Sequence, residues 1–209
     1  METSVLGSKA SQIWMFDGLL ERAFCEKFVD ELGKVYSLVS QRGMTMGGVL
    51  SDTKTSMDCF FTQSKFREVN VEWTDFFQDA EMQFLEALRK GIAIVKNGSR
   101  SLFSWSAIDD TGFQIQKYPQ CEGFYREHID AFPSTPTDSR VLSVIVYLND
   151  VDFGGETAFP LHEVAVKPVA GRIIMFPSVW THPHEGRTPI SGDKWILNTF
   201  ITNNEPHSH

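Results

Sequence analysis

The feature that most restricts the fold is a change of pattern near the middle of the chain. From about residue 100 onward, helical spacing disappears and turn-forming segments such as FGGET and PVAG separate short apolar runs. Runs of this length, rich in β-branched and aromatic residues, favour strands. The strand-length runs are FQIQKY, VLSVIVYL, EVAVKP, RIIMF and WILNTFI.

Short strands that follow one another without intervening helices favour an antiparallel sheet, and closing or sandwiching that sheet protects its edges. We therefore expect an α+β, mainly β protein with a double-stranded β-helix core, the jelly-roll or cupin-like architecture. Residues 96–204 would form this core, and residues 1–95 would form a helical lead-in packed on its outside. The 209 residues, 42% of them hydrophobic, suffice for a single domain spanning 1–209.

The lead-in begins with a segment of helical spacing. Asp17 is the expected N-cap of this helix and Gly33 its expected stop, since these residue types favour the two helix ends. Four hydrophobic residues repeat at intervals of four and would form the buried face: Leu20, Phe24, Phe28 and Leu32.

A second helix is expected from Thr74 to Lys90, ended by Gly91, with an apolar stripe that includes Phe77 and Phe84. We interpret these aromatic residues as core. Between the two helices, residues 43–65 mix Gly, Ser, Thr and Met and are expected to form a loop and an edge strand.

The charge and the chain ends limit the expected partners. A formal net charge of −8 argues against nonspecific binding of nucleic acid, which depends on clustered Lys and Arg. No apolar run approaches the roughly 20 residues of a membrane helix, and the first residues, METSVLGSKASQ, resemble no signal peptide. We therefore expect a cytoplasmic protein without a membrane partner.

The cysteines give no sign of a cross-link. Cys25, Cys59 and Cys121 are odd in number and show no CxxC spacing. Neither a disulfide framework nor a structural zinc site is therefore expected.

His128 and Asp130 are separated by one residue, so on a strand their side chains would point to the same face and share one ligand. Such a pair is expected by chance in a chain with 6 His and 27 acidic residues. It gains meaning only with a third ligand. His182 and His184, in the segment WTHPHEG, are both candidates. Two histidines and one carboxylate leave coordination positions open, as non-haem iron oxygenases require, whereas structural zinc sites use four ligands.

Lys194 follows His184 by ten residues, at the start of WILNTFI. A lysine there is usually a solvated strand end. Alternatively, its ammonium is buried in the barrel and pairs with the remote carboxylate of a dicarboxylate. Tyr118 and Tyr147, in FQIQKY and VLSVIVYL, either donate hydrogen bonds to the same ligand or fill the core.

Four segments, YPQCEGFYREHID, RVLSVIVYLNDVDFGGETAF, VAGRIIMFP and HEGRTPISGDKW, resemble in order and spacing the prolyl 4-hydroxylase-like family of 2-oxoglutarate/iron(II)-dependent dioxygenases. The resemblance covers roughly residues 113–202. It implies a single active site that binds iron and 2-oxoglutarate.

The resemblance assigns roles to individual residues. It implies that His128, Asp130 and His184 are the iron ligands, whereas His182 does not align with a ligand. Lys194 matches the family's basic residue for the far carboxylate of 2-oxoglutarate. Tyr118 and Tyr147 match tyrosines that line that pocket, and residues 154–157 match the family's Gly-Gly-Glu-Thr turn.

The implied cofactors are Fe(II), 2-oxoglutarate as cosubstrate, and O₂, with ascorbate as an aid in keeping the iron reduced. The implied reaction hydroxylates an unactivated C–H bond while 2-oxoglutarate is decarboxylated to succinate and CO₂. Peptidyl proline is the favoured substrate, and the expected partner is a peptide or a small molecule. The segment AFPSTPTDS after Asp130 is expected at the rim of the site.

Three other readings stay open. The chain would alternatively hydroxylate another side chain or a free metabolite, or act as a metal-binding β-barrel module without oxygenase activity. A zinc hydrolase or isomerase on a cupin-like barrel fits the three ligands but does not explain Lys194.

Overall fold

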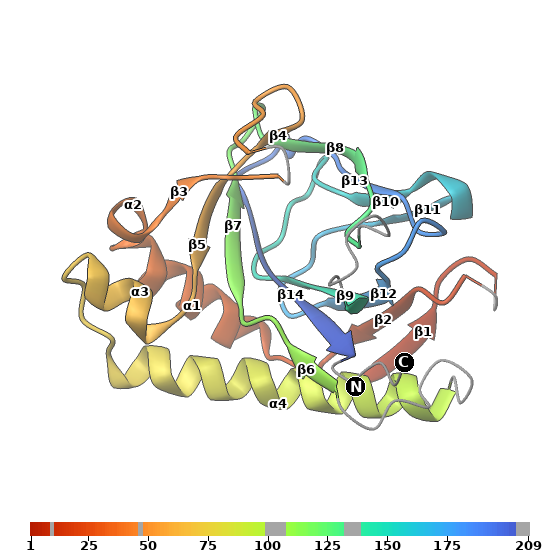
Figure 1. Ribbon diagram of the computed structural model, residues 1–209, viewed down its shortest axis with the longest axis horizontal. Coiled ribbons are helices and arrows are strands. Elements are labelled where there is room, and N and C mark those ends of the chain that lie inside the picture. Colours follow the sequence, from red (N-terminus) through yellow and green to blue (C-terminus); the bar gives the residue numbers. More distant parts are fainter. Residues whose placement is uncertain (9–10, 46–47, 99–107, 132–138, 204–209) are drawn as a thin grey trace, which may run out of the picture.

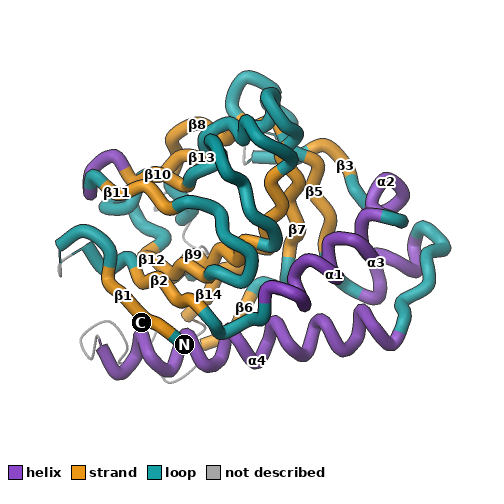
Figure 2. The backbone as a smooth tube through the Cα atoms, turned by 180° about the vertical axis from the view of Figure 1, so that it is seen from behind, coloured by secondary structure: helices purple, strands orange, loops and turns teal. Residues whose placement is uncertain are grey.

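Two antiparallel sheets lie face to face, and helices cover the outer side of the larger one (Figures 1 and 2). The structure is a computed structural model that describes residues 1–8, 11–45, 48–98, 108–131 and 139–203. Residues 132–138, most of the segment expected at the rim of the site, lie outside this description. The expected double-stranded β-helix is confirmed.

The large sheet runs through the middle of the molecule. In spatial order its strands are β1 (Glu2–Val5), β2 (Trp14–Asp17), β12 (Ile173–Pro177), β9 (Arg140–Tyr147), β14 (Lys194–Asn203), β7 (Gln114–Tyr118), β5 (Met57–Phe60) and β3 (Gln41–Arg42), and β6 (Ile108–Asp110) also pairs with β14.

The small sheet faces it across the interior. Its strands in spatial order are β11 (Val164–Val166), β10 (Thr157–Phe159), β13 (His184–Gly186), β8 (Phe124–His128) and β4 (Lys54–Thr55). A short 3₁₀ turn, η2 (Pro160–His162), joins β10 to β11. The four helices are α1 (Arg22–Gly33), α2 (Tyr36–Val39), α3 (Gln63–Glu68) and α4 (Asp75–Gly98).

Alternation along the strands separates two apolar clusters. On β9, Leu142, Val144 and Val146 belong to the cluster shared with the helices, whereas Ile145 and Tyr147 belong to the cluster between the sheets. Successive side chains on a strand point to opposite faces, so residue parity decides which side chains reach the interior. The same rule sends the even-numbered residues of β14, Lys194 among them, inward.

The helices seal the outer face with aromatic side chains. Phe28 of α1 contacts Phe84 and Phe77 of α4 at ring-centroid distances of 5.0 and 6.4 Å, both edge to face. Aromatic pairs of this geometry contribute packing beyond their buried area. The outer face of the large sheet is therefore packed against an apolar core shared with the helices. Its inner face remains available to line a cavity.

The expected start of the first helix is wrong. Asp17 ends strand β2, and α1 begins only at Arg22, after Glu21 as N-cap. β2 pairs with β12 and β1, so the chain is extended where helical spacing was expected to begin. Pairing within the sheet satisfies these backbone groups, and Leu20 reaches the same core from outside the helix.

The expected end of the second helix is also wrong. α4 runs through Gly91 to Gly98. A Cβ at Gly91 would lie 2.3 Å from the Met175 side chain on β12. Gly91 therefore permits close packing of the helix on the sheet rather than ending the helix. At the start, the Thr74 hydroxyl accepts a hydrogen bond from the Phe77 N–H at 3.3 Å, as a cap does.

Residues from the first part of the chain also enter both sheets. β5 pairs with β7 in the large sheet, and β4 pairs with β8 in the small one. The edge strand expected within residues 43–65 is present, and it is accompanied by helix α3. Among the described helices, α4 included, none is both long and apolar enough to cross a membrane.

Candidate metal centre

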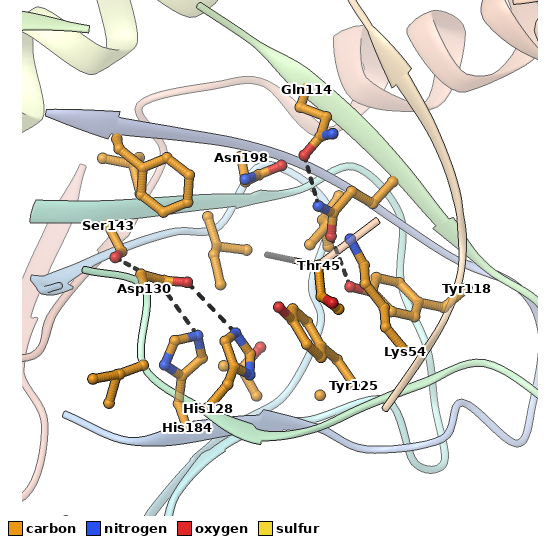
Figure 3. Close-up of a pocket in the computed structure, with 18 of the residues that line it drawn as sticks. Thr45, Lys54, Gln114, Tyr118, Tyr125, His128, Asp130, Ser143, His184 and Asn198 are labelled. Carbon is orange, nitrogen blue, oxygen red and sulfur yellow. Dashed lines mark hydrogen bonds and ion pairs between the residues drawn. The ribbon is translucent and has the colours of Figure 1, made fainter. Parts of the chain in front are cut away.

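Three potential ligands meet between the sheets. His128 is the last residue of β8 and His184 the first of β13, and the antiparallel register makes them direct cross-strand partners. Asp130 follows two residues after His128. Its two carboxylate oxygens lie 3.5 Å from His128 Nε2 and 3.6 Å from His184 Nε2 (Figure 3). All the ligand atoms lie within 4.8 Å of one another, which is close enough to surround one metal ion.

The backbone sets which nitrogen of each histidine faces the centre. His128 Nδ1 lies 2.8 Å from the Arg126 carbonyl oxygen, and His184 Nδ1 lies 3.2 Å from that of His182. A carbonyl only accepts, so each Nδ1 carries a hydrogen and donates it. Each Nε2 then keeps a free lone pair toward the centre, as a metal ligand needs.

Asp130 is held by neighbouring hydroxyl groups. Ser143 donates a hydrogen bond to Asp130 Oδ2 at 2.6 Å, and the Ser178 hydroxyl lies 2.9 Å from that of Ser143. Burial alone would raise the pKa of Asp130, but His184, His128 and the Ser143 hydroxyl together lower it well below its usual value. The carboxylate therefore stays ionised and available to a cation.

His184 is enclosed by apolar rings. Phe176 and Phe159 lie 4.7 and 5.6 Å from the imidazole, and His184 is 4% exposed. Burial lowers the pKa of His184 to about 4, although the neighbouring Asp130 opposes this effect. The imidazole is thus neutral at physiological pH, which is the protonation state that binds metals.

His182 has a different environment. Its Nε2 donates to the Ser11 carbonyl oxygen at 2.5 Å, and its Nδ1 lies 2.9 Å from the Thr181 hydroxyl. Its ring stacks on His162 at 4.6 Å. With both nitrogens engaged by the protein, His182 fastens the segment before His184 to the N-terminal segment.

The three residues line a cavity of about 410 Å³ that also contains Lys194. Lys194 is 2% exposed, and no described side chain accepts a hydrogen bond from its ammonium or forms an ion pair with it. The ammonium lies 5.5 and 5.6 Å from the rings of Tyr118 and Tyr147. Burial lowers the pKa of Lys194 to about 7, only partly opposed by Glu156.

Tyr118 lines the cavity whereas Tyr147 does not, and both hydroxyls donate within the protein. Tyr118 donates to Gln116 Oε1 at 2.7 Å, and Tyr147 donates to the Thr157 hydroxyl at 2.8 Å. Thr157 lines the cavity whereas Tyr147 is completely buried behind it. Thr157 is therefore the residue of this pair that reaches the cavity, and the sequence had suggested only a turn there.

Other cavity residues had no motif to mark them. Gln114, Gln116 and Asn198 form an amide row on β7 and β14, and Gln116 Nε2 donates to Gln114 Oε1 at 2.9 Å. The Asn198 side-chain oxygen is buried and has no hydrogen-bond partner among the described residues. Tyr125 stacks on His128. Only strand parity could have suggested the amide row, and only once the inward face of each strand was known.

Comparison with known sequences matches residues 113–202 to the 2OG-Fe(II) oxygenase superfamily. This segment contains all three potential ligands and Lys194. The chain is also 27% identical over 178 residues to prolyl 4-hydroxylase 1 of Arabidopsis thaliana. That match covers 74% of this chain and 55% of the relative, so the chain spans about half the length of this relative.

Solved structures share the fold at low identity. The viral collagen prolyl hydroxylase of Paramecium Bursaria Chlorella virus-1, in its 2OG complex, aligns with a TM-score of 0.66 at 19% identity and covers 91% of this chain and 95% of that one. The prolyl hydroxylase of Trichoplax adhaerens, in complex with a hypoxia inducible factor peptide fragment, gives 0.68 at 17% identity, over 93% and 85% of the two chains.

Proposed function

Because residues 113–202 match the 2OG-Fe(II) oxygenase superfamily, we propose that this protein is an Fe(II)- and 2-oxoglutarate-dependent dioxygenase that hydroxylates peptidyl proline. One observation carries the proposal. A cluster of two imidazoles and one carboxylate shares a buried cavity with an ammonium that lacks a described counterion. The three potential metal ligands and the unpaired ammonium together fit a dicarboxylate cosubstrate. The three ligands alone would fit many kinds of metal-dependent reaction.

The donor set fits iron(II). Two imidazole nitrogens and one carboxylate oxygen are the facial arrangement of non-haem iron oxygenases, which leaves positions for cosubstrate and oxygen. His128, Asp130 and His184 would hold the ion through Nε2, a carboxylate oxygen and Nε2. The hydrogen bonds at each Nδ1 and from Ser143 would fix the orientation of these ligands before the ion arrives.

Lys194 fits the far carboxylate of 2-oxoglutarate. An ammonium buried without a counterion is costly, and a bound carboxylate would remove that cost. Tyr118 and Thr157 line the same cavity. The Thr157 hydroxyl accepts from Tyr147 and would donate to the carboxylate, and Tyr118 would do so by redirecting the hydrogen that it donates to Gln116. The viral collagen prolyl hydroxylase, whose structure is a 2OG complex, supports this choice of cosubstrate.

The metal and 2-oxoglutarate would supply the oxidation, in which O₂ is consumed and 2-oxoglutarate becomes succinate and CO₂. The side chains of this protein would bind and orient. Lys194 would bind the far carboxylate of the cosubstrate, and the three ligands would hold the ion to which its other end binds. Phe159 and Phe176 would keep water from His184. Ascorbate would keep the iron reduced.

Peptidyl proline is the proposed substrate because the relatives named above are prolyl hydroxylases, one of them bound to a peptide. The amide row of Gln114, Gln116 and Asn198 offers hydrogen bonds to a backbone as well as to a polar side chain. Hydroxylation of another side chain is therefore the second candidate, and the unpartnered oxygen of Asn198 favours a substrate with an N–H group nearby.

The test is turnover of 2-oxoglutarate to succinate by the full chain with added iron(II), with and without a proline-containing peptide. We expect succinate, increased by the peptide, and a peptide product heavier by one oxygen atom. His184→Ala is the negative variant and His182→Ala is its matched control. Metal binding without succinate production under any of these conditions would instead support a binding module.

A further inference from the structure

A buried ion pair lies beside the cavity, outside the proposed ligands, and its lysine lines the cavity. Lys54 Nζ of β4 and Asp58 Oδ2 of β5 are 2.7 Å apart, and their side chains are only 3% and 4% exposed. Ser56 donates to the other carboxylate oxygen of Asp58 at 2.7 Å. The pair joins the small sheet to the large one. Burying two charges costs desolvation energy that their attraction does not always recover, so a gain in stability alone is a weak explanation for the pair.

The lysine of this ion pair contacts the ring of Tyr125. Lys54 and Tyr125 are cross-strand partners of β4 and β8. The Lys54 ammonium lies 5.1 Å from the centre of the Tyr125 ring, within the range of a cation–π contact. On its other side the Tyr125 ring stacks on the His128 imidazole, with centroids 3.5 Å apart and planes inclined by 16°. Figure 3 shows Tyr125 between Lys54 and His128.

The two proposed histidine ligands are supported differently. His184 is packed between Phe159 and Phe176 in the apolar interior. The His128 side chain is 15% exposed, and its ring neighbours among the described residues are Tyr125 and the other proposed ligand, His184. Of these two, only Tyr125 lies flat against the imidazole. The hydrogen bond from His128 Nδ1 to the Arg126 carbonyl directs one edge of the ring, and the flat contact with Tyr125 limits rotation of its plane.

We propose that Lys54 and Asp58 form a positioning pair: they hold Tyr125 flat against His128 and so fix the plane in which His128 Nε2 faces the metal. This inference rests on the proposed function. Asp58 has a second part in it, because its charge balances that of Lys54. An unbalanced ammonium in the wall of the same cavity would repel a divalent cation.

Co²⁺ is a suitable probe, because its visible absorption reports both affinity and ligand geometry without turnover. Lys54→Met/Asp58→Asn removes both charges, keeps similar side-chain volumes, and leaves an acceptor for Ser56. We expect this variant to fold with Co²⁺ affinity about 10-fold weaker and with an altered visible spectrum, as is usual when a group supporting a metal ligand is lost. Asp58→Asn alone should weaken the affinity further, since Lys54 then stays unbalanced.

Tyr125 and a second lysine provide the controls. Tyr125→Leu should weaken Co²⁺ binding to a similar extent. Tyr125→Phe should keep most of the wild-type affinity, because the ring is kept. Lys117 also pairs with a carboxylate, Asp193 at 2.7 Å, and lies 5.2 Å from the Trp195 ring, but it does not line the cavity. Lys117→Met should leave the affinity and the spectrum at their wild-type values.

The outcomes separate this inference from the proposed function. If the wild-type protein binds Co²⁺ and Lys54→Met/Asp58→Asn gives the same affinity and spectrum, the positioning role is wrong. A double variant that changes only the KM for a peptide would also overturn it and would indicate a substrate contact. If the wild-type protein and His184→Ala both fail to bind Co²⁺, the metal centre itself is wrong.

Discussion

Two lysines are buried in the wall of the same cavity, and their surroundings differ. Lys194 lies between two tyrosine rings without a described counterion, and burial lowers its pKa to about 7. Lys54 is paired with Asp58 at 2.7 Å. A buried charge is costly until it is paired. The unpaired lysine is therefore suited to receive an anionic ligand, whereas the paired one already belongs to the framework.

Both lysines are assigned their roles relative to a metal ion in this cavity. Removal of one metal ligand should therefore have the largest effect. Asp130→Ala should abolish succinate production and the weak visible absorption band expected when iron(II) and 2-oxoglutarate are combined without oxygen. Asp130 would be the only anionic ligand of the three and would offset one of the ion's two positive charges. If the variant kept the band and full turnover, Asp130 would not be a ligand, and neither lysine could be described relative to a metal.

Substitution of two neighbouring histidines tests which of them is a metal ligand. His184→Ala should eliminate turnover, because its Nε2 faces Asp130. His182→Ala should keep most of the activity and lower the melting temperature, because it loses the hydrogen bonds to Ser11 and Thr181, at about 1 kcal/mol each, and the stacking on His162. Succinate assays and thermal unfolding measure the two effects. The reverse pattern would shift the ligand by two residues.

Substitution of Lys194 tests directly whether its unpaired ammonium binds the far carboxylate of 2-oxoglutarate. Lys194→Ala should raise the required 2-oxoglutarate concentration by roughly two to four orders of magnitude, because losing a partner from a buried pair costs about 3–5 kcal/mol. Iron binding should stay nearly intact, since the lysine is no ligand. Lys194→Arg should keep partial activity, since its planar fork meets a carboxylate in a different geometry. An unchanged requirement in Lys194→Ala would contradict the assignment.

The pH dependence of cosubstrate binding gives the smallest expected effect. The pKa of Lys194 is lowered from 10.5 to about 7, so the ammonium is present below pH 7 and is lost as the pH rises through 7. Affinity for 2-oxoglutarate should then fall by up to about tenfold per pH unit above 7, with proton uptake on binding. Calorimetry at several pH values measures both. Lys194→Arg stays charged and should show neither effect.

The sequence identified the residues of the candidate centre because their evidence is short and ordered. His128, Asp130, His184 and Lys194 lie in segments whose order and spacing resemble one family. The structure brings all four to one cavity, while their roles remain predictions. The strand runs were also predicted well, since alternation along a strand is a local property: WILNTFI lies within β14.

Local patterns failed where a distant segment decides the conformation. Asp17 has the residue type of a helix cap, yet pairing of β2 with β12 makes it the end of a strand. Gly91 has the residue type of a helix stop, yet Met175 packs against it and α4 continues. Asp17 itself faces Glu2 of β1, but the strand β12 that pairs with β2, and Met175 on that strand, both lie more than 80 residues away in the chain.

The sequence by itself thus determined which short segments become strands and which residue types could bind a metal and a dicarboxylate. Tertiary structure alone decided that Lys54 meets Asp58 and that both support Tyr125 against His128. The physical reason is register. A side chain's face follows from its own strand, but its neighbour depends on how two strands align, and a slip of one residue would exchange every inward side chain for an outward one.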